Sequence, residues 1–303
     1  MRLKKGWKFF VLMMAVLSLA GMLGLSSCGA FSAGKLGDGT ENGDQTEIED
    51  KESGDRKTET DRLEEEQAGT IAEDDIKDVT ESAKEGETEV VKTNGHVVGI
   101  DPGHQGSWVD MSEQEPDAPG SSNYKAKATA GTTGRFTGVA EYELNLDISL
   151  ALRDELVKRG YRVVLTREDN DTAISNSERA IKAAEEGSEI YVRIHANGSD
   201  DSSVSGALGM TPSPSNPYVG QLSEDSYRLT ESILNAYCEA TGFGNLGIQY
   251  HDNMTGINWS SIPVTILEMG FMTNESDDTL MQDKAMQEKM VQGIADGIDK
   301  YFS

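Results

Sequence analysis

The stretch "YVRIHANG", Tyr191 to Gly198, decides the fold because an apolar, β-prone run ends in a histidine. Tyrosine, valine and isoleucine are enriched in strands, and a short run of this kind, bounded by turn residues, predicts a buried strand. We place that strand over 189–194, with His195 directly after it. A lone histidine after a strand is usually structural, so His195 gains a function only if other residues join it.

Strands and helices alternate on both sides of this run. Alternation of this kind predicts an α/β fold, a three-layer sandwich with a mostly parallel, mixed open sheet flanked by helices. Long loops are expected at 104–138 and 242–261. The predicted strands cover 96–101, 161–166, 189–194, 206–211 and 264–268, and the predicted helices cover 141–160, 175–187, 221–242 and 284–302.

Residues 1–27 have the pattern of a secretory signal. Four basic residues and no acidic residue precede or flank an apolar run from Phe9 to Leu25. The run ends in "LSSC", which resembles the bacterial lipobox, so we predict a lipoprotein signal peptide with lipidation at Cys28. An ordinary signal peptide or an uncleaved anchor, each with an incidental cysteine, is the alternative. Two or three chains on one cysteine anchor a protein stably.

The rest of the chain divides into a linker and one domain. Residues 31–94 hold 21 Asp and Glu against 8 Lys and Arg, with Phe31 as the one aromatic residue. Such a segment buries too little apolar surface to fold, so we predict a disordered acidic linker over 28–94 and a folded domain over 95–303. That domain is also acidic, which argues against nucleic acid as a partner. Cys238, the other cysteine, is expected inside a helix as a small core residue.

Residues capable of metal or proton chemistry fall at related places in this fold. His104 follows the first strand through "DPG", His195 follows "EIYVRI", and Glu268 ends "VTILE". Ligands of open α/β sheets bind beyond the carboxyl ends of the strands, and Glu141, which opens the first helix, can lean over that edge. A purely structural role explains each of these residues alone equally well. Two histidines and two glutamates are, however, not expected to gather at one edge of a sheet by chance.

The chemistry of such a group is that of a metal hydrolase. Two imidazoles and one carboxylate form a known catalytic zinc set that leaves the fourth position open to water. The remaining glutamate then suits the role of general base. Strand alternation places Arg193 on the face of Tyr191 and His195, near this group.

With these residues in place, the sequence is similar to the zinc-dependent N-acetylmuramoyl-L-alanine amidases, also called amidase type 3. The resemblance implies one Zn²⁺ per domain, held by His104, Glu141 and His195, with Glu268 as the catalytic glutamate. It also implies the zinc amidase fold, which zinc peptidases share. Gln105 departs from the glycine that many members carry. The similarity covers 96–303 and rests on four ordered blocks: "GIDPGHQG" (99–106), "EYELNLDISLAL" (141–152), "RIHANGS" (193–199) and "ILEMGFMTN" (266–274).

The implied function is that of a peptidoglycan hydrolase. Zinc-activated water would cleave the amide between the lactyl group of N-acetylmuramic acid and L-alanine of the stem peptide, in cell-wall turnover, division or spore-related lysis. A non-catalytic wall-binding or regulatory domain and a zinc peptidase acting on the stem peptide are alternatives. A glycosidase with paired carboxylates would leave both histidines unexplained.

Further expectations concern the substrate and the place of action. The candidate substrate contacts are Arg135, Asn197 and Trp259. Two of these have a structural alternative: Arg135 as a solvated loop residue, and Trp259 as a side chain that packs its loop onto the core. His251 is not expected to be a ligand. We expect a monomer that acts on peptidoglycan. It would lie outside the cytoplasm, anchored by lipid to the outer face of the bacterial cell membrane and facing the cell wall.

Overall fold

The computed structural model describes residues 93–303. The predicted signal peptide, the lipidation of Cys28 and nearly all of the predicted linker therefore lie outside the described residues and stay predictions. Within 93–303, none of the helices is both long and apolar enough to cross a membrane.

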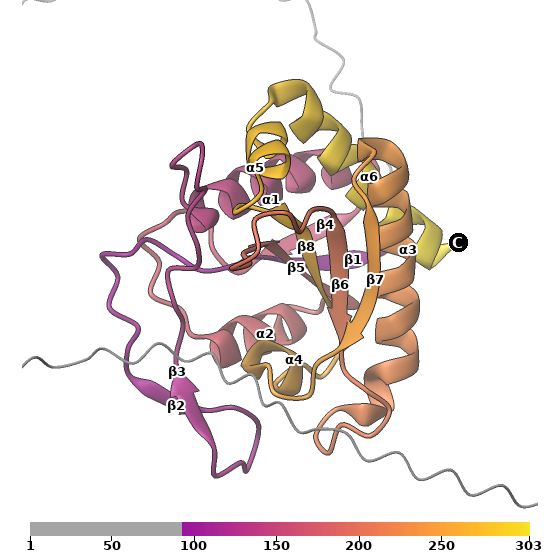
Figure 1. The fold of residues 1–303 in the computed structure, drawn as a ribbon. Coiled ribbons are helices and arrows are strands. Elements are labelled where there is room, and N and C mark those ends of the chain that lie inside the picture. The colour runs from indigo at the N-terminus through magenta and orange to yellow at the C-terminus, as the bar shows by residue number, and fades with distance from the viewer. Residues whose placement is uncertain (1–92) are drawn as a thin grey trace, which may run out of the picture. The chain divides into compact units, whose positions relative to one another are not determined.

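A six-stranded sheet forms the middle layer, in the order β4-β1-β5-β8-β6-β7 (Figure 1). Four neighbouring strands are parallel, and β6 runs antiparallel to β8 but parallel to β7. This is the mostly parallel, mixed sheet that the sequence predicts. Its strands are β1 (Val97–Pro102), β4 (Arg162–Leu165), β5 (Ile190–Asn197), β6 (Ala207–Thr211), β7 (Asn245–Tyr250) and β8 (Val264–Phe271).

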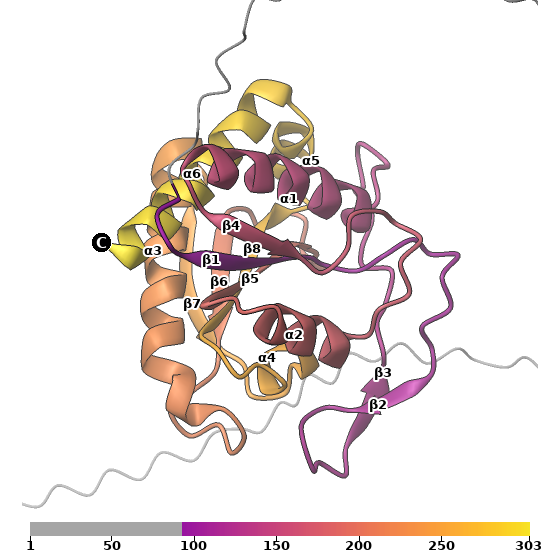
Figure 2. The same cartoon turned by 180° about the vertical axis from the view of Figure 1, so that it is seen from behind.

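Helices cover the two faces of the sheet unequally. On one face lie the three long helices, α1 (Glu141–Lys158), α3 (Ser223–Thr241) and α6 (Lys284–Phe302). On the other lie α2 (Asn176–Glu185) and the single turn α4 (Thr255–Asn258), as both views show (Figures 1 and 2). The layers confirm the predicted three-layer sandwich.

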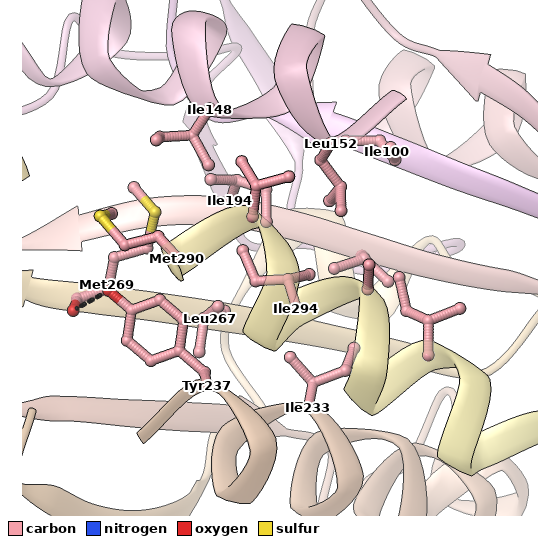
Figure 3. Close-up of a cluster of buried hydrophobic side chains, with 14 of the residues drawn as sticks. Ile100, Ile148, Leu152, Ile194, Ile233, Tyr237, Leu267, Met269, Met290 and Ile294 are labelled. Atoms are coloured by element: carbon pink, nitrogen blue, oxygen red, sulfur yellow. Dashed lines mark hydrogen bonds between the residues drawn. The ribbon is translucent and has the colours of Figure 1, made fainter. Parts of the chain in front are cut away.

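The face under the long helices carries the main hydrophobic core. Ile148 and Leu152, one turn apart on α1, are buried against strand residues such as Ile194, and helices α3 and α6 complete the cluster (Figure 3). Burying a side chain of this size stabilises a fold by about 1.5–3 kcal/mol. The hydroxyl of Tyr237 donates a hydrogen bond of 2.7 Å to the carbonyl of Met269, so this buried polar group is satisfied.

The opposite face has less helical cover. Helix α2 begins where the sequence predicts, because Ser175 accepts a hydrogen bond from the amide of Glu178 and Glu178 bonds back to the amide of Ser175. It has only 10 residues and α4 has 4. These two short helices therefore leave part of this sheet face uncovered by helix.

Strands β5 and β8 are longer than predicted. β5 runs on to Asn197 and β8 to Phe271, so His195 and Glu268 lie inside strands and not at their ends. The two strands pair throughout, with a bulge between His195 and Asn197. The prediction ended the two strands at Ile194 and Glu268, whereas the backbone ladder continues because both strands have a neighbour on each side.

The two predicted loops also contain regular structure. Residues 242–261 include strand β7 and helix α4, and residues 104–138 include a hairpin of β2 (Gln114–Pro116) and β3 (Tyr124–Ala126). Helix α5 (Glu275–Met281), which follows β8, was not predicted. β7 is an edge strand whose one partner is β6 and most of its side chains are exposed. It therefore lacks the apolar pattern by which buried strands are recognised.

Candidate metal site and catalytic cavity

The structure brings together the three predicted ligands. One side-chain ligand atom from each of His104, Glu141 and His195 lies within 4.8 Å of the other two. His104 follows β1, Glu141 is the first residue of α1, and His195 projects from β5. Three elements far apart in sequence thus meet at one point.

Two imidazoles face the same carboxylate oxygen. Nε2 of His104 lies 3.1 Å and Nδ1 of His195 lies 3.2 Å from Oε1 of Glu141. The other ring nitrogen of His104, Nδ1, lies 2.9 Å from the carbonyl oxygen of Thr129. A carbonyl oxygen can only accept a hydrogen bond, so Nδ1 carries the proton. In the neutral ring the lone pair is then at Nε2, facing Oε1. A ring in this form can give the Nε2 lone pair to a metal cation.

His195 fits a metal ligand for a second reason. Its Nε2 is buried and has no hydrogen-bond partner among the described residues, and buried polar atoms normally have one. Burial lowers the pKa of His195 to about 4, against the opposing effect of Glu141. The ring is therefore neutral at physiological pH, which is the form that binds metal ions.

Glu141 is held as a carboxylate. Its Oε2 accepts a hydrogen bond of 2.9 Å from the amide of Thr132, and its Oε1 accepts bonds from the amide of Ala196 (3.2 Å) and from Nδ2 of Asn145 (3.3 Å). Burial raises the pKa of Glu141, but the contacts with the two histidines outweigh burial and hold the pKa well below its ordinary value. Glu143, two residues further along the helix, instead accepts from the amide of Ala140 and caps the helix.

The ligands are packed against backbone at unusual positions. His104 has a left-handed φ of 63°, the one non-glycine residue of the described chain with a positive φ, and such conformations persist where the surroundings enforce them. A Cβ at Gly103 would lie 2.3 Å from the ring of His195. Only glycine therefore allows the chain to pass this close to the imidazole.

A buried charge network stands behind the ligands. Asp101 on β1 accepts hydrogen bonds of 2.8 Å from Nη1 of Arg179 and from Nε of Arg193. Arg179 also donates to the carbonyl of His104 at 2.8 Å, and Arg167 donates to the carbonyls of Gly103 (3.0 Å) and Tyr142 (2.9 Å). The two arginines thus position the loop that carries His104 and the start of α1.

No role was predicted for Arg179. A usable signal was present, because the buried residues of α2 include Arg179 and Ala183, four positions apart. An arginine on the apolar stripe of a helix has to find buried partners. The prediction that Arg193 shares a face with the site is confirmed, since both it and His195 border the same cavity.

Glu268 lies beside His195. The two residues are register partners on the neighbouring parallel strands β8 and β5. Burial raises the pKa of Glu268 to about 8, the nearby carboxylate of Glu141 adds to the increase, and Arg193 opposes it. A carboxyl group tuned to this range suits proton transfer near neutral pH.

These groups open into a cavity of about 340 Å³ on the α2 and α4 side of the sheet. Another depression, of about 460 Å³ between α1 and α6, lies apart from the clustered histidines. The residues lining the first cavity include both histidines and Glu268, and the others are Lys125, Ala126, Thr129, Asn176, Arg193, Met210, Met254, Thr255, Gly256 and Ile266.

The three predicted substrate contacts are not among the residues that line this cavity. The indole nitrogen of Trp259 donates to the carbonyl of Pro116 (3.0 Å) and so ties α4 to the β2–β3 hairpin. Asn197 accepts at its side chain from the amide of Gly198, and Arg135 is exposed. Their roles toward substrate stay predictions. The ring of His251 contacts Gln249, away from the ligand group.

Fold and site together define an α/β domain in which two histidines and one carboxylate form a candidate cation site beside a buried glutamic acid. The family follows from comparison with known proteins. Residues 98–300 match the model of the amidase type 3 family, described as N-acetylmuramoyl-L-alanine amidase. The chain belongs to this family of cell-wall hydrolases, and its fold is that of the solved members.

Particular relatives agree. The chain is 30% identical over 210 residues to the N-acetylmuramoyl-L-alanine amidase LytC of Bacillus subtilis, covering 69% of this chain and 36% of LytC. It is 28% identical over 209 residues to the probable cell wall amidase LytH of Staphylococcus aureus, covering 69% of this chain and 59% of LytH. The apo form of the amidase Ami1 from Mycobacterium abscessus superposes with a TM-score of 0.63 at 26% identity, covering 69% of this chain and 99% of Ami1.

The raised pKa of Glu268 predicts a pH-dependent effect on stability in the metal-free protein. Between pH 4.5, its ordinary pKa, and about 8, the native state holds a proton that the unfolded state has released, so stability falls as pH rises. Glu268→Gln removes this penalty. We expect the variant to be more stable than wild type at pH 8–9, by on the order of a few kcal/mol, and the difference to shrink below pH 4.5. Urea unfolding of both proteins after chelation measures it, and an equal difference at every pH would contradict the assigned pKa.

Proposed function

We propose that this domain hydrolyses the amide between the lactyl group of N-acetylmuramic acid and L-alanine of the peptidoglycan stem peptide, with one zinc ion. One observation carries the proposal. The two imidazoles of His104 and His195 and the carboxylate of Glu141 converge on one point, next to a buried Glu268 that lines the same cavity. Membership of the amidase family supports the choice of bond.

The ligand set suits zinc. His104, Glu141 and His195 would hold the ion, since one ligand atom from each lies within 4.8 Å of the other two. The nitrogen and carboxylate donors are those of catalytic zinc sites, which keep one position open. Bound zinc supplies a Lewis acid for the scissile carbonyl and lowers the pKa of a bound water toward about 7.

The protein's own residues then move the protons. Positive charge at the ligands lowers the pKa of Glu268 from its raised value, so its carboxylate form is accessible at neutral pH. Glu268 takes the proton of the attacking water and, once protonated, gives it to the leaving amine of alanine. Its burial keeps bulk water from competing for that proton.

The alternatives differ in how they use these groups. A glycosidase with paired carboxylates needs Glu141 free to act on a sugar, whereas both oxygens of Glu141 are engaged by histidines and backbone amides. A zinc peptidase would use the same site on another amide of the stem peptide, so the products have to distinguish the two. The proposed cleavage would serve cell-wall turnover, division or spore-related lysis.

Digestion of purified peptidoglycan tests the bond. We expect new amino termini of L-alanine and no new reducing sugar ends, because the leaving group is an amine. Dinitrophenyl labelling with mass spectrometry of the products measures the termini, and a reducing-sugar assay measures the sugar ends. New termini at another peptide bond would replace the amidase by a peptidase, and new reducing ends would replace it by a glycosidase.

Metal content and turnover should separate in two variants. Glu268→Gln keeps the ligands, so we expect stoichiometric zinc and a loss of turnover of at least about 100-fold, in the range that general acid–base catalysis supplies. His195→Ala removes a ligand, so zinc and turnover should both be lost. His251→Ala, outside the site, is the control for both measurements. Stoichiometric zinc in the His195 variant, measured by atomic emission, would refute the ligand assignment.

We also propose that the chain is exported and anchored by lipid at Cys28, and acts as a monomer on the cell wall. The basic start, the apolar run and "LSSC" support this. In cells fed a labelled fatty acid, wild type should carry label and partition with membranes, whereas Cys28→Ala should not. Cys238→Ala is the matched control and should keep the label. Unlabelled wild-type protein would favour an ordinary signal peptide or an uncleaved anchor.

A further inference from the structure

The cavity has a cation that the proposed chemistry does not use. Lys125, on strand β3, lines the cavity together with His104 and Glu268. It is half-buried, and its Nζ donates to the backbone carbonyl of Asn253. The ammonium group has three donors, and this single bond to a neutral acceptor leaves its charge without a counter-ion.

The other cations near the cavity are already paired. Lys127, two residues along the same hairpin, binds Glu113 at 2.6 Å. Arg193 binds Asp101 and Asn176, both at 2.8 Å. Lys125 forms no ion pair with any carboxylate of residues 93–303.

Glu268 is not the missing counter-ion. It lines the same cavity, but no ion pair joins it to Lys125. The chain as a whole carries a net charge of −26. An isolated ammonium group that faces the cavity of such an acidic protein is therefore a specific place for an anion.

The hairpin that presents Lys125 is anchored on both sides. The amide of Asn176 donates to the carbonyl of Lys127 at 2.8 Å, which fastens the hairpin to α2. Trp259 donates to Pro116, which fastens it to α4. The position of Lys125 is thus set before any ligand arrives, and a preorganised group loses less entropy on binding.

The rest of the lining indicates what carries the anion. Met210, Met254 and Ile266 supply aliphatic surface, and no aromatic side chain other than histidine lines the cavity. Flat sugar-stacking surfaces are thus missing from this lining, whereas small aliphatic groups such as the methyl of alanine fit it. These features favour the peptide side of the substrate.

We propose that Lys125 is a specificity-determining residue that binds a free carboxylate on the stem peptide, on the residue next to the alanine whose amine is released. Enzymes that hydrogen-bond a charged group lose affinity for the uncharged analogue, because the charged partner is left unpaired. The domain therefore discriminates between stem peptides that carry this carboxylate and those in which it is amidated. This inference rests on the proposed amidase function.

Two synthetic muramoyl peptides test it, identical except that the second residue carries a carboxylate in one and a carboxamide in the other. With the zinc-loaded full chain, wild type should cleave the carboxylate with about tenfold higher kcat/KM, mostly through KM. Lys125→Met should bring the ratio of the two substrates close to one, and Lys125→Arg should restore the preference. Lys127→Met, which removes a paired cation from the same hairpin, should keep the wild-type ratio.

A ratio within one protein preparation is insensitive to the fraction of unfolded protein. A preference restored in Lys125→Arg and kept in Lys127→Met separates loss of the ammonium group from displacement of the hairpin. Equal cleavage of both substrates by wild type would overturn the role of Lys125 and leave the amidase function intact. An unchanged ratio in Lys125→Met would do the same. If wild type released no alanine amine from either substrate, the proposed function and this inference would both fail.

Discussion

Asp101 has a fully buried carboxylate that two guanidinium groups share, and the geometry of the site depends on it. Arg179 comes from α2 and Arg193 from β5, so the carboxylate joins three elements: β1, α2 and β5. Burial raises the pKa of Asp101, but the two arginines outweigh it and hold the pKa far below its ordinary value. A buried charge of this kind gains little net stability over apolar packing, yet removal of one partner is expensive, about 3–5 kcal/mol. The main effect of the network is therefore to fix the relative positions of β1, α2 and β5, and its net contribution to stability is small.

That arrangement extends directly to the ligands. With its second nitrogen, Arg179 holds the carbonyl of His104, and this contact stabilises the left-handed backbone there. Arg167 reaches both the carbonyl of Gly103 and that of Tyr142, next to Glu141. Backbone carbonyls at His104 and next to both His104 and Glu141 are thus bound to buried arginines. The proposed metal site would need this support, because ligands are effective only when their supporting contacts orient them.

Elements with periodic apolar residues were predicted from the sequence, whereas elements held by isolated long-range contacts were not. Helix α6 was predicted with its observed bounds, 284–302, because its apolar residues recur at helical spacing. The ligand group was predicted because strand ends in an open sheet converge, although His195 and Glu268 proved to lie inside strands, on one face. Neither the β2–β3 hairpin nor Trp259 as its tether could be predicted. Their stability comes from single hydrogen bonds between distant segments, such as the one from Trp259 to Pro116, and these leave no periodic pattern.

The two faces of the sheet divide stability from function. Long helices bury the main core on one face, where Leu152, Tyr237 and Ile294 are fully or almost fully buried. On the other face the short helices α2 and α4 leave room for a cavity, and the hairpin that carries Lys125 forms part of its lining. Because the first face supplies most of the apolar burial, the second can hold an uncharged histidine, a raised carboxyl pKa and an unpaired ammonium group, each of which would weaken a domain with one small core. Met210 and Met254 line the cavity and also belong to the second, smaller hydrophobic cluster, so this face combines packing with the candidate site.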